Sequence, residues 1–169
     1  MFDHPVLGVD PGTASMGLAL VAGDSRRPRV EWAITVRTPP GAAALRLSHV
    51  FRAVTSAIAD RSPRALAMER LLWGRNTGSA MEVARASGAV MVAAAEAGVT
   101  VHEYAPLEVK MAVAGVGNAP KDQVRRALSR LFAIDGLPDE PDAVDAVAVA
   151  VCHLVQSPLR SLSRAADAT

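Results

Sequence analysis

The stretch VLGVDPGTASMGLAL, residues 6–20, contains two apolar runs separated by a Pro-Gly-Thr corner. The first run ends on Asp10, and the second resumes at Met16. Short apolar runs bounded by such turn residues are typical of buried β-strands. The segment therefore predicts two strands, at residues 5–10 and 16–22, joined by a tight turn. It also places a carboxylate at the end of a buried strand, which needs an explanation because buried charges are costly.

The rest of the chain alternates between strand and helix patterns. A third strand, at residues 29–38, follows a polar loop, so we expect the first three strands to form an antiparallel meander. Further on, apolar residues recur at steps of three and four, which predicts helices, whereas short apolar runs predict two more strands. The expected helices cover residues 42–60, 78–97, 106–113, 120–133 and 141–156, and the expected later strands cover residues 65–69 and 99–104.

This order of elements predicts an α/β fold. Three meander strands are followed by two strands that alternate with helices, and such alternation favours parallel pairing. We therefore expect a mixed five-stranded sheet, three strands antiparallel and two parallel, with helices on both faces. We expect residues 1–157 to form a single domain. The Ser-, Ala- and Arg-rich residues 158–169 are expected to form a flexible C-terminal tail.

Composition narrows the class of protein. The 169 residues are 50% hydrophobic and 21% charged with a formal net charge of +1, which fits a globular protein without an overall basic surface. The chain has one cysteine, Cys152, so it predicts neither a disulfide framework nor a thiolate metal site. It contains no signal-peptide pattern and no apolar run long enough to span a bilayer. We expect a cytoplasmic protein that does not interact with membranes.

Four acidic residues stand at positions that suggest a common site. Asp10 and Glu69 each end a predicted strand, and ligands of open α/β sheets gather at the carboxyl ends of strands. Asp142 and Asp145 begin the last predicted helix with i, i+3 spacing, which places them on one face. Asp145 lies in a run of Ala and Val, and a buried carboxylate must be paired, hydrogen-bonded or bound to a metal.

Each acid also has a simpler interpretation when it is taken alone. Asp10 could cap the Pro-Gly turn, Glu69 could pair with a neighbouring arginine, and Asp142 could stabilise the helix start through the helix dipole. Together in one pocket, however, the four carboxylates would repel one another, and divalent cations relieve such repulsion. Oxygen ligands without Cys or His favour Mg²⁺ or Mn²⁺. The pattern therefore indicates a nuclease in which two metal ions promote phosphodiester hydrolysis.

Four motifs, in order, resemble the RuvC family of Holliday-junction resolvases, the crossover junction endodeoxyribonucleases. They are LGVDPGT at 7–13, AME at 67–69 followed by NTGSA at 76–80, EYAPLEVK at 103–110, and DAVDAVAVAVCH at 142–153. The resemblance extends over residues 6–156 with order and spacing intact. It implies a ribonuclease-H-like fold and an enzyme that cuts two symmetrically placed strands of a four-way DNA junction in recombination and repair. The implied products carry 5′-phosphate and 3′-hydroxyl ends.

The resemblance also implies partners, cofactors and site residues. It implies a homodimer, four-way junction DNA as substrate, a branch-migration motor of RuvA- and RuvB-type proteins, and two Mg²⁺ or Mn²⁺ ions per active site. Lys110 and Lys121 are the only lysines in the chain, and they fall on basic positions that serve catalysis and DNA binding. The family's metal-binding catalytic positions are matched by Asp10, Glu69, Asp142 and Asp145.

The sequence departs from the family pattern in the segment after Glu69. Relatives commonly carry a phenylalanine three residues later that wedges against junction bases, whereas this chain has Leu72 followed by Trp73. Either Leu72 acts as the wedge or Trp73 stacks on a base, although Trp73 could instead anchor the loop in the core. The expected DNA-binding residues of this region are Arg70, Leu72, Trp73, Arg75 and Asn76.

Two other function classes fit part of the sequence. Asp-x-Gly-Thr loops also hold phosphates in actin-like ATPases, but those proteins need two such domains and 169 residues leave no room for a second. A non-catalytic junction-binding module is the other alternative. Such a module would be expected to lose negative charge near DNA phosphates, whereas all four acids are present here.

Overall fold

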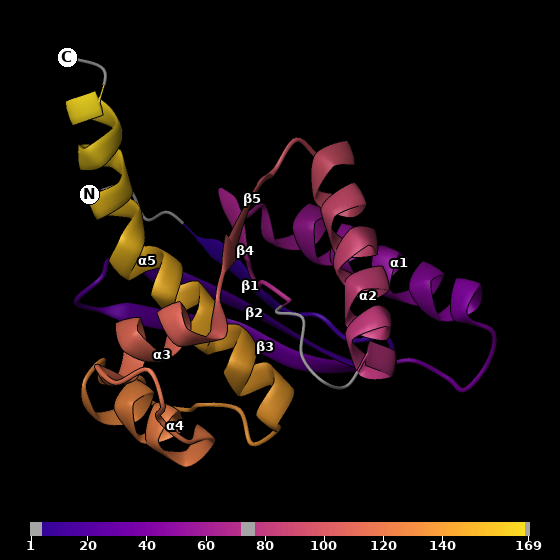
Figure 1. Cartoon of the computed structure of the whole chain (residues 1–169), viewed down its shortest axis with the longest axis horizontal. Helices are drawn as coiled ribbons and strands as arrows, with labels where there is room; N and C mark the ends of the chain where they lie inside the picture. The colour runs from indigo at the N-terminus through magenta and orange to yellow at the C-terminus, as the bar shows by residue number, and fades with distance from the viewer. Residues whose placement is uncertain (1–4, 72–76, 168–169) are drawn as a thin grey trace.

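The computed structural model describes residues 5–71 and 77–167, and of residues 77, 79 and 158–167 only the backbone. Its described part contains one five-stranded sheet in the order β3-β2-β1-β4-β5 (Figure 1). The first three strands pair antiparallel, and β4 and β5 join parallel to β1. The expected mixed sheet is confirmed. The strands are β1 (Val6–Asp10), β2 (Ser15–Gly23), β3 (Pro28–Arg37), β4 (Ala65–Glu69) and β5 (Thr100–Tyr104).

Helices cover both faces of this sheet, as expected. One face is covered by α1 and α2, which pack against each other, and the other by α5, which crosses β1 and β2 (Figure 1). Two short helices, α3 and α4, pack beside α5. None of the helices in the described ranges is both long and apolar enough to cross a bilayer. The bounds are α1 (Ala43–Arg61), α2 (Thr77–Glu96), α3 (Pro106–Ala114), α4 (Lys121–Arg130) and α5 (Pro141–Asp167).

The last two helices differ in length from the prediction. The helix α4 ends at Arg130 rather than near residue 133, because Ala133 adopts the left-handed conformation (φ 52°), through which a right-handed helix does not continue. The helix α5 continues past residue 156 to Asp167. Its backbone stays helical after Pro158 because the residues that follow include Leu, Arg and Ala, which have high helix propensity.

Alternation along the central strands decides which side chains face α5. Val6 belongs to the core between the sheet and α5, whereas Leu7 belongs to the core under α1 and α2. Successive strand residues point to opposite faces, so Asp10 shares the α5 face with Val6. In β4, Ala67 also lies in the α5 core, and Glu69, two residues on, shares its face. The alternation thus turns both strand-end acids toward the helix that carries the other two.

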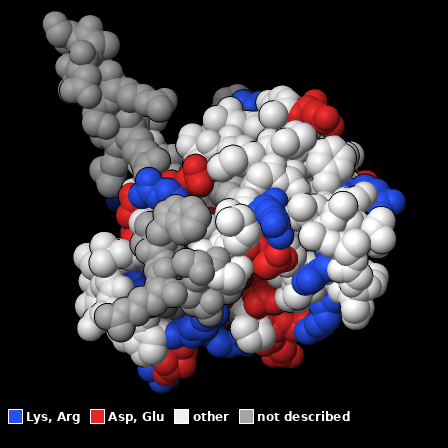
Figure 2. Space-filling model, turned by 45° about the vertical axis from the view of Figure 1, so that its right-hand side comes forward, with Lys and Arg blue, Asp and Glu red and all other residues white. Residues whose placement is uncertain are grey.

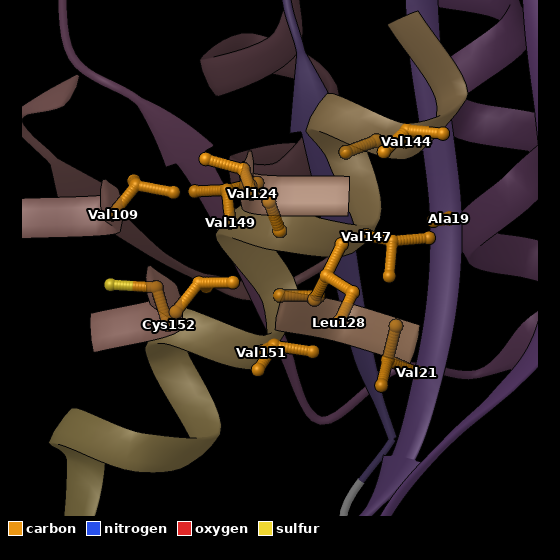
Figure 3. Packing of buried hydrophobic residues seen from close by; sticks show 14 of the residues in the cluster. Ala19, Val21, Val109, Val124, Leu128, Val144, Val147, Val149, Val151 and Cys152 are labelled. Atoms are coloured by element: carbon orange, nitrogen blue, oxygen red, sulfur yellow. The ribbon is translucent and has the colours of Figure 1, made fainter. Parts of the chain in front are cut away.

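The side of the core next to α5 is built mainly from small and β-branched side chains. Val147 and Val151 of α5 lie close to Ala19 and Val21 of β2, and α4 adds Leu128 (Figure 3). All five side chains are fully buried. This packing fixes α5 against the sheet along the buried part of its length.

Two glycines allow α5 to approach the sheet closely. A Cβ atom at Gly8 would lie 2.0 Å from the carbonyl oxygen of Ala146, and one at Gly17 would lie 1.9 Å from that of Asp142. Both neighbours are backbone atoms, which cannot rotate away. Gly17 also pairs with Asp10 in the β1–β2 ladder. The first turn of α5 therefore lies directly on the strand pair that carries Asp10.

Candidate active site

A cavity of about 280 Å³ lies where β1 and β4 end beside α5. Five predicted site residues line it, each from a different element: Asp10 of β1, Glu69 of β4, Lys110 of α3, Lys121 of α4 and Asp145 of α5. On the face shown in Figure 2, acidic side chains gather in a hollow with basic side chains around it. The tertiary structure thus brings three of the four predicted acids and both lysines to one place.

The crowding of carboxylates changes their protonation. Burial, followed by the negative charges of Asp145, Glu69 and Asp142, raises the pKa of Asp10 from 3.8 to about 7. Burial and the charge of Asp145 also raise the pKa of Glu69 above its ordinary value, although Lys121 and Lys110 oppose this shift. Without a bound cation, the pocket therefore resists carrying all of its negative charge at neutral pH.

Lys121 places a positive charge directly beside one of the acids of this pocket. Its Nζ donates a hydrogen bond to Asp145 Oδ2 at 2.5 Å, and this bond raises the pKa of the Lys121 ammonium. The lysine side chain is 75% exposed and that of Asp145 is 24% exposed, so the pair lies at the mouth of the pocket. Lys121 therefore remains charged at neutral pH and neutralises one of the acids.

Asp142 takes a different position from the other three acids. It is not among the residues that line the cavity, although its charge contributes to the raised pKa of Asp10. Its Oδ2 atom accepts a hydrogen bond from the hydroxyl of Ser15, the first residue of β2. Sequence reasoning did not find Ser15, because nothing in a single sequence distinguishes this serine from an ordinary turn residue.

The turn after Asp10 is tied to two helices and to the residue that follows β3. The buried Thr13 donates from Oγ1 to Glu82 of α2 at 2.8 Å. Its carbonyl oxygen accepts hydrogen bonds from the Thr38 hydroxyl and from Arg46 of α1. These contacts hold the end of β1, and with it Asp10, in a fixed position.

The predicted DNA-binding residues after Glu69 are only partly described. Arg70 lines a second cavity of about 250 Å³ that shares Asp10 and Glu69 with the first. Its guanidinium lies 3.7 Å from Glu108. A basic side chain therefore borders the acidic pocket on this side. The other predictions for this segment, Leu72, Trp73, Arg75 and Asn76, lie outside the described residues.

The donor chemistry of the pocket fits a hard divalent cation. The acids offer only oxygen ligands, and a cation would relieve the repulsion that raises the pKa of Asp10. Within the described ranges, no three Asp, Glu, His or Cys side chains are placed to hold one ion as they stand. Two of the acids have other partners, since Asp145 binds Lys121 and Asp142 binds Ser15. To bind an ion through Oδ2, Asp145 would therefore have to give up its hydrogen bond to Lys121.

Comparison with known proteins gives one consistent result. The family model described as crossover junction endodeoxyribonuclease RuvC matches residues 6–153. A crossover junction endodeoxyribonuclease RuvC from Moorella thermoacetica is 40% identical over 156 residues, which are 92% of this chain and 93% of that protein. The structure of T. thermophilus RuvC in complex with a Holliday junction substrate superposes with a TM-score of 0.86 at 33% identity, covering 93% of this chain and 96% of the other.

A more distant likeness is confined to the fold. The yeast mitochondrial Holliday junction resolvase Ydc2 superposes with a TM-score of 0.69 at 13% identity, covering 94% of this chain and 82% of that one. Identity this low carries no information about individual site residues. It shows that the mixed sheet and its helices recur in a protein whose sequence has diverged almost completely.

Proposed function

The chain belongs to the RuvC family of crossover junction endodeoxyribonucleases, and from this premise we propose that the acidic pocket is its junction-cleaving active site. The protein has the ribonuclease-H-like fold of the family and is a nuclease that resolves Holliday junctions in recombination and repair. The observation that carries the assignment of the site is the meeting of Asp10, Glu69 and Asp145 with two lysines in one cavity. Residues 1–157 would then form a single nuclease domain.

A nuclease of this family depends on a divalent metal ion. We assign two Mg²⁺ or Mn²⁺ ions to the pocket, which the carboxylates of Asp10, Glu69, Asp145 and Asp142 would hold. When bound, such ions activate water and stabilise the leaving oxygen of the phosphodiester. Two observations support this assignment: the pocket offers carboxylate oxygens as ligands, and the pKa of Asp10 is raised. A pair of bound cations would lower that pKa again.

The lysines act on the DNA strand rather than on the acids alone. Lys121 is largely exposed at the mouth of the pocket, and Lys110 lines the same cavity from α3. Both can contact the phosphate next to the scissile bond and offset its charge. Water then adds to phosphorus as the bond to the 3′-oxygen breaks, which leaves 5′-phosphate and 3′-hydroxyl ends that a ligase can rejoin.

The function can be tested with a synthetic four-way junction. We expect symmetric, ligatable nicks in two opposite strands with Mg²⁺ or Mn²⁺, and no nicks with EDTA because the carboxylates alone cannot activate water. Gel analysis of end-labelled strands measures the cleavage, and a mobility shift in EDTA measures binding. Binding without nicking in either metal would instead identify a junction-binding module. ATP hydrolysis without cleavage would identify an ATPase.

Symmetric cleavage requires two active sites, and α2 offers a surface for a homodimer. Its solvent-exposed positions Met81, Arg85, Gly88 and Val92 follow each other at steps of four, three and four, which places them on one helix face. The side chains of Met81 and Val92 are 45% and 51% exposed. Exposed apolar side chains with this spacing are typical of helices that pack against a second helix, and Arg85, which pairs with Glu82, lies between them. We propose that two copies associate through this stripe.

Replacing Val92 with glutamate is expected to dissociate the homodimer, because a dimer would have to bury a new charge at the C-terminal end of the stripe. Sedimentation velocity measures the change in mass. The matched control is Ser129→Glu, which adds the same charge at an exposed position of α4 on the other side of the sheet. An unchanged dimer in the Val92 variant would contradict the assignment of this surface.

The remaining partner and location follow from the family. We propose that a branch-migration motor of RuvA- and RuvB-type proteins presents the junction to this dimer. We also propose that the protein works in the cytoplasm, since its relatives are bacterial and bacterial chromosomes lie there.

A further inference from the structure

The first turn of α5 is held to the sheet at three neighbouring points. The Ser15 hydroxyl donates to Asp142 Oδ2, and Gly17 lies beneath the Asp142 backbone with no room for a Cβ atom. Ser15 pairs with Arg37 across β2 and β3, and the Arg37 guanidinium contacts Glu140 at 2.9 Å. Two polar side chains on adjacent strands thus contact two acids at the start of one helix.

Of these contacts, only the hydrogen bond from Ser15 involves the side chain of a proposed metal ligand, Asp142. The Arg37–Glu140 pair is largely exposed, with side chains 70% and 44% accessible, and such pairs contribute little to stability. The Ser15 bond instead uses one oxygen of the Asp142 carboxylate and fixes the rotation of the carboxylate plane. A carboxylate has a second oxygen with lone pairs of its own, with which Asp142 would bind a cation while Oδ2 accepts from Ser15.

We propose that Ser15 is a positioning residue that orients the Asp142 carboxylate for metal binding. This inference rests on the proposed function, in which Asp142 completes the ligand set. Hydrogen bonds to a ligating carboxylate orient it before the ion arrives, and their loss commonly weakens metal affinity. Because Asp142 is partly exposed, its side chain without Ser15 would be free to turn toward solvent.

The test is a series of variants at Ser15, read out as Mn²⁺ affinity of the DNA-free protein by electron paramagnetic resonance. Ser15→Ala is expected to weaken Mn²⁺ binding about tenfold. Ser15→Thr keeps the hydroxyl and is expected to keep the wild-type affinity, whereas Ser15→Val has the shape of threonine without the hydroxyl and should behave like alanine. Threonine and valine both suit a strand, and melting temperatures measured in EDTA show whether each variant is folded.

Asp142→Asn separates this inference from the proposed function. The asparagine variant is expected to weaken Mn²⁺ binding, and adding Ser15→Ala to it should weaken binding no further, because the serine acts through the carboxylate. If Asp142→Asn leaves Mn²⁺ affinity unchanged, the proposed ligand set is wrong. If Asp142→Asn weakens binding but Ser15→Ala lowers only the melting temperature, Ser15 has a structural role and the inference is wrong while the function stands.

Discussion

Replacing Asp10 with asparagine is expected to abolish junction cleavage and, at the same time, to stabilise the metal-free protein above neutral pH. Removing a residue that hydrogen-bonds to a metal ligand lowers activity by up to about a hundredfold. Here the ligand itself is removed, so cleavage should fall by at least that factor. Junction binding should be largely retained, because Asp10 lines the acidic floor of the pocket and carries no positive charge for phosphates.

The gain in stability follows from the raised pKa of Asp10. The carboxyl has a pKa of about 7 in the folded state against 3.8 when it is unperturbed, so the folded chain binds this proton more tightly than the unfolded chain. Stability of the metal-free wild type therefore falls as pH rises from about 4 to about 7. Above that range the cost is on the order of a few kcal/mol. Asparagine has no charge and avoids this cost.

Thermal unfolding in EDTA at pH 5 and pH 8 measures this effect. The Asp10→Asn variant should melt above the wild type at pH 8, and the difference should shrink at pH 5, where much of the wild-type carboxyl is protonated. Added Mg²⁺ should raise the melting temperature of the wild type more than that of the variant, because ligand binding to the folded state is stabilising. Asp60→Asn, at an exposed position of α1, is the matched control and should change neither cleavage nor melting. An active Asp10→Asn enzyme would refute the assignment of the site.

Replacing Gly17 with alanine is expected to displace the first turn of α5 and to inactivate the enzyme. The new Cβ atom would lie 1.9 Å from the carbonyl oxygen of Asp142, a contact that only a shift of the backbone can relieve. Overpacking of this kind costs about 3 kcal/mol, which lowers the melting temperature of a chain of this size by roughly 6–12 °C. The shift also moves Asp142 and Asp145 away from Asp10.

Gly98→Ala is the control that separates loss of stability from loss of geometry. Gly98 has a positive φ of 68° and open space around its Cβ position, so alanine there costs about 1–2 kcal/mol of backbone strain without a clash. The residue lies in the turn between α2 and β5, at the end of the sheet opposite Glu69. At a temperature well below the melting temperatures of both glycine variants, Gly98→Ala should cleave the junction normally. Full cleavage by the Gly17→Ala variant would show that α5 tolerates the shift.

The two acids of α5 show how far sequence reasoning extended and where it stopped. Their i, i+3 spacing correctly placed both on one face of a helix, and strand alternation brought Asp10 and Glu69 toward that face. Helix and strand periods are local properties that a sequence carries directly. The different environments of Asp142 and Asp145 were not predictable. Ser15 binds one and Lys121 the other, and each partner comes from another element that only the tertiary structure brings beside α5.

The same division holds for element boundaries. The predicted strand at residues 65–69 has the bounds of β4, because an apolar run between polar turns marks both of its ends. The end of α4 was predicted three residues too late, since the left-handed conformation of Ala133 has no signal in a non-glycine residue. The end of α5 was predicted too early because a proline inside a helix usually signals its end.

The sequence by itself determined the order of the elements, the faces of the strands and the four acids of the family pattern, because each depends on residue type and short-range spacing. Only the tertiary structure decided how closely α5 lies on β1 and β2, and therefore which groups Asp142 and Asp145 contact. That distance depends on the missing side chains of Gly8 and Gly17, which act only once the helix lies on the sheet. The Asp10 carboxylate at the end of its strand is explained by this packing, because the close approach of α5 surrounds it with the other acids and raises its pKa.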